Sequence, residues 1–154
     1  VPRVEGCVST LDTFNYVDEE GLRATFERVA EALVPGGAFV FDINSEFRLL
    51  EEIGGGTWIF EKDNVFYTWE GDRVSSWLTF FVEGEDGRYD RIDEEQVQYY
   101  HSPERVQGLL EEAGFEQVRL KDFDGGGDLH DETRRILISC RKKRSGWENE
   151  GMAH

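Results

Sequence analysis

Polar side chains cluster where two apolar runs of the chain end. Asp12 follows the first run and Asp42 follows the second. Three further side chains accompany these two carboxylates: Asn15, Tyr16 and Asn44. In open parallel sheets, ligands bind outside the carboxyl ends of the strands, and carboxylates accept charge-assisted hydrogen bonds. The set therefore predicts an anionic rim that suits a cationic or amine-bearing ligand. The alternative is that the first carboxylate caps a turn and the second caps the next helix.

A strand–helix–strand unit is needed to bring the two carboxylates together. Val4–Leu11 is apolar and β-branched, which predicts a buried strand. Asp18 is a good N-cap for the helix that follows, and Pro35-Gly36-Gly37 ends that helix. Ala38–Phe41 is short and apolar on both faces, which is typical of a central parallel strand covered by helices on both sides. Glu46–Ile53 predicts a further short helix.

The middle of the chain predicts an antiparallel meander of about three strands. Trp58–Glu70, Arg73–Glu83 and Arg88–Tyr100 are β-prone segments. Gly71-Asp72 and Glu85–Gly87 separate them as turn signals. The large aromatic residues in this region are more typical of a core than of a cofactor site.

The last third predicts one helix and two strands. Ser102 and Pro103 are suited to the N-cap and the first helical position, and Gly114 to the left-handed residue that closes the helix. Strands are expected from Phe115 to about residue 123 and over Arg135–Cys140. Residues 144–154 show no periodicity and are expected to be a disordered tail.

The charge balance excludes several classes of partner. The 154 residues carry 33 acidic and 17 basic side chains, a formal net charge of −16. Such a surface repels nucleic acids and anionic membranes, so we expect neither as a partner. An aromatic share of 13% is too rich for a disordered acidic chain. Cys7 and Cys140 give no disulfide framework, and no apolar run reaches the length of a membrane span. The expected location is therefore the cytoplasm.

Simple searches for reactive motifs are negative. The sequence has no glycine-rich strand–turn–helix and no Gly-x-Ser-x-Gly elbow. The three histidines, His101, His130 and His154, lie far apart. The spacing of Asp128, His130 and Asp131 matches no standard metal site. We therefore predict no metal site, and no catalytic base can be named.

Four segments, in this order and spacing, resemble the C-terminal part of a known family. Leu33–Gly37 precedes an apolar strand as "L-x-P-G-G", and Leu110–Val118 matches "L-x-x-A-G-F-x-x-V". Thr79–Asp90 is similar to a β insertion, and Arg135–Cys140 to a final antiparallel strand. The family is the class I S-adenosylmethionine-dependent methyltransferases, in a bacterial subgroup that acts on small molecules. The resemblance covers nearly all of residues 4–143.

The resemblance implies an α/β, Rossmann-like fold, S-adenosylmethionine as cofactor, and methyl transfer to a small-molecule acceptor. The fold would consist of a β-α-β unit, an antiparallel β insertion over 57–100, a helix and a final antiparallel β pair, together spanning 1–143. The residues implied on the cofactor side are Ser9, Thr10 and Leu11. Those implied on the substrate side are Asp12, Asn15, Tyr16, Asp42, Asn44 and, more weakly, Tyr100 and His101.

The sequence departs from the family at two places. The glycine-rich loop and the acidic residue that hold the family's cofactor are not found, so the chain matches the family from just before its fourth strand. The subgroup also carries His and Arg near the end of the insertion, where this chain has Glu95–His101. We therefore expect the chain alone to be inactive, and the edge of its first strand to promote self-association. The alternatives are a non-enzymatic acidic α+β module that binds a partner or a cationic ligand, and a methyltransferase-like domain that binds without turnover.

Overall fold

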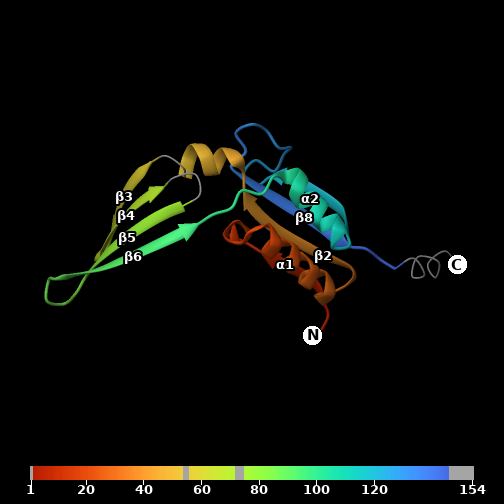
Figure 1. Ribbon diagram of the computed structural model, residues 1–154, viewed down its shortest axis with the longest axis horizontal. Helices are drawn as coiled ribbons and strands as arrows, with labels where there is room; N and C mark the ends of the chain where they lie inside the picture. The colour runs from red at the N-terminus through yellow and green to blue at the C-terminus, as the bar shows by residue number, and fades with distance from the viewer. Residues whose placement is uncertain (1, 54–55, 72–74, 146–154) are drawn as a thin grey trace.

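The chain forms two sheets that follow one another along the long axis of the molecule (Figure 1). The computed structural model describes residues 2–53, 56–71 and 75–145, without the side chains of residues 69–71. One sheet packs with both α-helices. The other sheet is built from the middle of the chain and extends away from them as a single layer (Figure 1). The predicted α/β architecture with an antiparallel insertion is therefore confirmed in outline.

The first sheet contains four strands in the order β1–β2–β8–β7. These strands are β1 (Val4–Ser9), β2 (Leu33–Asn44), β7 (Phe115–Asp122) and β8 (Arg135–Lys142). As predicted, β1 pairs with β2 in parallel, and β8 runs antiparallel to β2 and β7. This order makes β1 and β2 neighbours, so their carboxyl ends lie at the same edge of the sheet.

The strand β2 is longer than the sequence predicts. The preceding helix ends at Ala32, and Pro35-Gly36-Gly37 lies inside the strand rather than in a separate turn. Gly36 has a φ of 78°, which favours glycine because it has no Cβ. A Cβ on Gly37 would lie 2.8 Å from the carbonyl oxygen of Val34, so that position also requires a glycine. Val4 of β1 lies opposite Leu33 and Gly6 lies opposite Ala38, so β2 carries three extra residues between these two pairs.

Two α-helices follow from their caps. In α1 (Glu19–Ala32), the Asp18 carboxylate accepts a hydrogen bond from the Gly21 amide, and in α2 (Pro103–Glu112) the Ser102 hydroxyl accepts one from the Arg105 amide. Both predicted N-caps are confirmed. Gly114 has the expected positive φ, 96°. Among the described residues, no helix is long and apolar enough to span a bilayer.

Both α-helices pack on one face of the first sheet. Phe39, Phe41 and Ile43 alternate along β2 and are all buried in one cluster with the apolar residues of the two helices. On the opposite face, Ala38 and Val40 are half-buried and line a shallow hollow. The prediction that helices cover β2 on both sides is therefore wrong for the part of the chain described here. The apolar run has the same composition whichever face is covered, so the sequence does not distinguish the two cases.

The second sheet has four antiparallel strands, in the order β3–β4–β5–β6. They are β3 (Thr57–Lys62), β4 (Val65–Gly71), β5 (Ser75–Glu83) and β6 (Tyr89–Val97). The prediction of about three strands is wrong by one, because the chain turns within the segment predicted as a single strand. Asp63 there has a φ of 55°, and Asp and Asn at 63–64 are suited to such a two-residue hairpin. The predicted turn residue Asp72 lies outside the described residues.

Aromatic side chains form a row across the second sheet instead of a closed core. The register places Phe60, Tyr67, Phe80 and Ile92 side by side on the four strands. Phe60 stacks on Tyr67 at 4.9 Å between ring centroids, and Tyr67 lies 5.4 Å from Phe80. Phe60 remains 41% exposed and Ile92 54% exposed. The residues favoured as core at the sequence level were Phe66, Tyr67, Trp69 and Trp77. Phe66 and Tyr67 are half-buried and Trp77 is 42% exposed, so these three do not form a closed core, and the side chain of Trp69 lies outside the described residues.

Candidate functional site

The two predicted carboxylates meet where β1 and β2 end. The Asp12 amide donates a hydrogen bond of 3.0 Å to Asp42 Oδ2, and Asn44 Nδ2 donates one of 2.8 Å to Asp12 Oδ2. The Asp12 side chain caps no helix. The segment after β2 is capped by Ser45, whose hydroxyl accepts from the Arg48 amide at 3.1 Å. The alternative in which both carboxylates are simple caps is therefore wrong.

An arginine that the sequence did not single out lies between these carboxylates. Arg135 Nε is 3.3 Å from Asp42 Oδ2, and Arg135 Nη2 is 3.8 Å from Asp12 Oδ1. Its guanidinium also lies 5.6 Å from the ring centre of Phe123. With one guanidinium beside two carboxylates, the formal charge of the rim is −1 rather than −2. The available signal was an arginine opening an otherwise apolar strand.

Asn15 fastens the end of β1 to two other parts of the chain. Its side chain is fully buried, and its Oδ1 accepts from the Asn44 amide at 2.8 Å. Its Nδ2 donates to the Tyr99 carbonyl at 3.0 Å, and its own carbonyl accepts from the Tyr99 amide. Gln98, a residue missed at the sequence level, accepts from Asn44 Nδ2 at 3.1 Å. Asn15 and Asn44 therefore position the rim from inside rather than face a ligand.

The backbone at the end of β1 is held in an uncommon conformation. Leu11 and Asp12 have φ values of 60° and 49°, a left-handed region that costs non-glycine residues about 1–3 kcal/mol each. This turn ends β1 at Ser9, two residues before the predicted end. The Thr10 carbonyl is engaged by the Thr13 hydroxyl at 2.7 Å. Strained residues persist when surrounding contacts fix them, and the hydrogen bonds of Asp12 provide such contacts.

Tyr16 is the exposed member of the predicted substrate side. It ends the short helix η1 (Thr13–Tyr16) and is 43% exposed. Partial burial raises the pKa of its phenol, the charge of Asp12 raises it further, and Arg48 opposes the shift. The phenol therefore stays protonated near neutral pH and can donate a hydrogen bond.

Tyr100 and His101 are not part of the rim. Tyr100 lines a separate cavity of about 360 Å³ with Glu46 and His130. Burial raises the pKa of the Tyr100 phenol, and Glu46 and Glu104 add to the shift. His101 is buried, with Nε2 at 3.1 Å and 2.9 Å from two backbone carbonyl oxygens of the Phe14–Val17 segment. These two contacts of His101 hold η1 in place.

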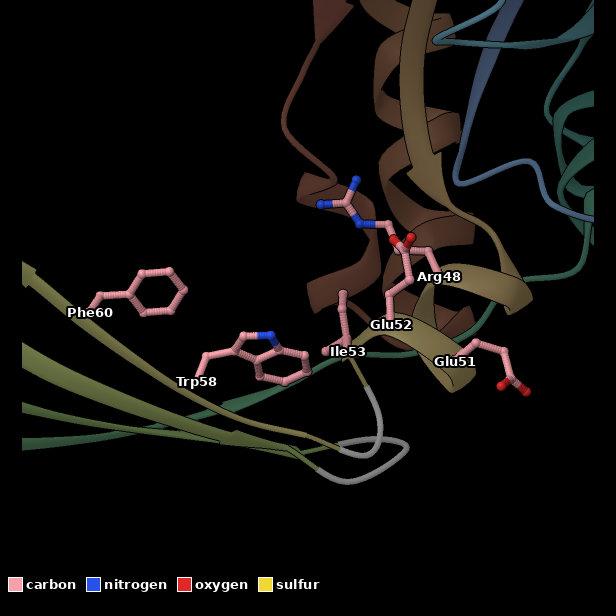
Figure 2. Close-up of a pocket in the computed structure, with 6 residues that line it drawn as sticks. All are labelled: Arg48, Glu51, Glu52, Ile53, Trp58 and Phe60. Atoms are coloured by element: carbon pink, nitrogen blue, oxygen red, sulfur yellow. The ribbon is translucent and has the colours of Figure 1, made fainter.

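A larger pocket lies beside the second sheet and was missed at the sequence level. Its volume is about 450 Å³, and it lies between the π-helical segment η2 (Arg48–Ile53) and β3. Its lining residues are Arg48, Glu51, Glu52, Ile53, Trp58 and Phe60 (Figure 2). Glu52 forms an ion pair with Arg134 at 2.7 Å. The pocket thus combines two aromatic rings with charged groups from one short helix.

The three residues predicted for the cofactor side, Ser9, Thr10 and Leu11, lie together at the end of β1. Leu11 is apolar and 71% exposed, and the strained backbone fixes it just above the strand. An exposed leucine held in this way suits the flat, apolar part of a nucleoside. Ser9 pairs with Phe41 in the register and Thr10 follows it, so the three predicted cofactor residues are contiguous at this edge. In the described part of the chain, no three side chains are arranged to hold a metal ion.

The chain is similar to known proteins both in sequence and in structure. No family model matches the sequence. A protein of Geobacillus sp. (strain WCH70) named "Putative methyltransferase" is 32% identical over 145 residues, which cover 89% of this chain and 58% of that protein. The crystal structure of an S-adenosylmethionine-dependent methyltransferase from Clostridium acetobutylicum ATCC 824 matches 93% of this chain and 60% of its own, with a TM-score of 0.81 and 29% identity.

A more distant solved structure has the same fold. CalS10, described as an amino pentose methyltransferase from Micromonospora echinaspora, matches 92% of this chain and 59% of its own, with a TM-score of 0.63 and 15% identity. The chain therefore spans about three fifths of the length of each protein that it matches. By sequence and by fold, the chain is a relative of the S-adenosylmethionine-dependent methyltransferases and corresponds to a C-terminal-like portion of them.

Proposed function

We propose that this chain forms the acceptor-side part of a methyltransferase that transfers a methyl group from S-adenosylmethionine to a small molecule. The observation that carries the proposal is the fixed polar rim at the carboxyl ends of β1 and β2, in a fold shared with a methyltransferase of known structure. The relation of CalS10 to an amino pentose supports a small molecule as the acceptor.

The chain's own residues would divide the work by position. Ser9, Thr10 and Leu11 would hold the cofactor, which supplies an electrophilic methyl group when bound. Asp12, whose side chain is 18% exposed, and the Tyr16 phenol are the polar groups of the rim that a ligand can reach. They would orient the nucleophilic atom of the acceptor, since methyl transfer depends mainly on positioning. No residue is assigned as the general base.

The remaining predicted residues would act through these two. Asp42 has a side chain only 2% exposed and is engaged by Arg135 and by the Asp12 amide. Asn15 and Asn44 are fully buried. Each would therefore position Asp12 rather than touch the acceptor. Tyr100 would contact only a ligand long enough to extend into its separate cavity.

Cofactor binding tests this proposal. We expect the 154-residue chain alone to bind no S-adenosylhomocysteine in calorimetry and to transfer no methyl group, because it contains no glycine-rich cofactor loop. A chimaera that adds the uncovered part of the Clostridium enzyme to this chain should bind S-adenosylhomocysteine. Methyl transfer by the chain alone would show that the expected inactivity is wrong. A folded chimaera that binds no cofactor would contradict the proposed function.

A further inference from the structure

We propose that the pocket between η2 and β3 binds the acceptor through an anionic group, a carboxylate or a phosphate, held by Arg48, with an apolar ring against Trp58 and Phe60. The inference rests on the proposed function only in identifying the ligand as the methyl acceptor. The anion site itself follows from the charges and contacts of the pocket, and it is testable without a cofactor.

The Arg48 guanidinium has no described counter-ion. Arg48 is half-buried and lines the pocket, yet it forms no ion pair with any described carboxylate, and its backbone amide rather than its side chain donates to Ser45. Other arginines nearby are engaged: Arg134 with Glu52, and Arg135 with Asp42. A half-buried cation that no described carboxylate neutralises retains its capacity for a bidentate, charge-assisted pair with a carboxylate or phosphate.

The described carboxylates near Arg48 have other partners or point away from it. Glu52 accepts from Arg134, and Asp12 accepts from Asn44. Glu94, which with Arg48 acts on the Tyr16 phenol, accepts from Gln96 at 2.7 Å. In Figure 2 the Arg48 side chain and that of Glu51 extend in opposite directions from η2. These carboxylates lower the positive potential around Arg48 but leave its donors available.

Two aromatic side chains form an apolar wall of the pocket. Trp58 and Phe60 come from the edge strand β3 and are 37% and 41% exposed. Figure 2 shows both rings on the side of β3 that faces η2. Ile53 adds an aliphatic surface. Phe60 is fixed by its stacking on Tyr67. A preformed aromatic wall with one convergent charge is typical of small-molecule sites, and about 450 Å³ is within their usual size.

The pocket is also placed to serve the rim. β2 ends at Asn44, whose side chain donates to Asp12, and η2 begins four residues later at Arg48. A ligand whose anionic group lies on Arg48 would extend its other end toward Asp12. This arrangement assigns recognition to Arg48 and orientation of the nucleophile to the rim. It also changes the ligand expected from the sequence, which was cationic, to one that carries a negative charge at its distal end.

Titration of the 154-residue chain with simple probes tests the anion site. The probes are phenylacetate, phenyl phosphate, the neutral phenylacetamide and the cationic phenethylamine, followed by calorimetry and by amide NMR shifts. We expect the anionic probes to bind at least tenfold more tightly than the amide and to shift residues of η2 and β3. Equal binding of the amide, or tightest binding of phenethylamine, would overturn the proposal. The two anionic probes together identify which anion is preferred.

Variants locate the site. Arg48→Gln should weaken binding of phenylacetate roughly tenfold or more, the effect of removing a charge-assisted hydrogen bond. Arg48→Lys should fall between the two, because it keeps the charge but loses the planar fork. The matched control is Arg28→Gln, an exposed arginine of α1 paired with Glu31, which should change nothing. Unchanged binding in a folded Arg48→Gln variant would overturn the proposal.

The outcome is distinguishable from that of the proposed function. Arg48-dependent binding of phenylacetate, together with a chimaera that binds no S-adenosylhomocysteine, would support the anion site and refute the proposed methyl-transfer function. Cofactor binding by the chimaera, together with no preference for anionic probes, would retain the enzyme and refute the anion site.

Discussion

Replacing Asn15 should cost more stability than almost any other polar substitution in this chain. Asn15→Ala removes the acceptor of the Asn44 amide and the donor to the Tyr99 carbonyl, at distances of 2.8 Å and 3.0 Å. Asn15 is fully buried, so we expect little water to replace the lost partners. An unsatisfied buried group costs about 1–3 kcal/mol. Two such groups predict a loss of about 2–6 kcal/mol in the free energy of unfolding.

Urea denaturation followed by circular dichroism measures this loss. With a slope of about 2 kcal/mol per molar urea, the middle of the usual range, the midpoint should fall by roughly 1–3 M. Asn15→Asp keeps the shape and the acceptor but places a carboxylate oxygen against the Tyr99 carbonyl, so it should be at least as destabilising as Asn15→Ala. The matched control is Asn64→Ala, which removes one exposed contact to the Glu83 carbonyl and should change stability by less than about 0.5 kcal/mol. A loss below about 1 kcal/mol for Asn15→Ala would show that the buried groups find other partners and that Asn15 does not fasten the rim.

Three further predictions concern thiols, phenols and the sheet edge. Burial raises the pKa of the Cys140 thiol to about 12, so iodoacetamide at pH 8 should modify the half-buried Cys7 and should react with Cys140 only after unfolding. Peptide mass spectrometry measures the labelling of both thiols. Labelling of Cys140 in the folded chain would contradict its burial. Burial raises the pKa of Tyr16 and Tyr100 above 10.0, so the folded chain holds these protons more tightly than the unfolded chain, and stability should be level to about pH 9 and fall above about pH 10. Tyr16→Phe should reduce that fall in urea titrations at pH 8 to 11, and an unchanged slope would refute the shift. Val8 is 69% exposed on β1, which pairs only with β2 among the described strands; light scattering should detect self-association that Val8→Lys reduces, and a monomer at all concentrations would show that this edge is not adhesive.

Local signals in the sequence predicted the elements of the first sheet well. Asp18 and Ser102 cap the two helices as expected, because a side-chain oxygen before an apolar-periodic run has few other roles. The parallel pairing of β1 with β2 followed from a single strand–helix–strand unit. The length of β2 did not follow, since Pro35-Gly36-Gly37 indicates a turn wherever it occurs. In the structure the ladder between β1 and β2 skips residues 34–37 and continues at Ala38, so the strand contains the glycines as an unpaired segment.

The candidate site was only partly predictable, because its members differ in how they are brought together. Asp12 and Asp42 were predicted from strand ends, a rule that needs only the local pattern. Arg135 comes close to both because β8 pairs with β2, and this pairing places Arg135 opposite Asn44. About ninety residues separate Arg135 from Asn44 in the sequence. Arg48, Trp58 and Phe60 meet in a pocket that depends on how η2 is placed against β3. No spacing in the sequence encodes that placement.

The position of β8 has a consequence for synthesis of the chain. β8 lies between β2 and β7 in the sheet, although it follows both in the sequence. As the polypeptide leaves the ribosome, β1, α1 and β2 can assemble early, and the β3–β6 meander can form from neighbouring segments alone. The centre of the first sheet, however, has no occupant until Arg135–Lys142 has been translated. Until then β2 and β7 each present an open edge, which is the period when a nascent chain is most prone to pair with another molecule. A chaperone that binds nascent chains would therefore be expected to remain associated until the last strand has been inserted.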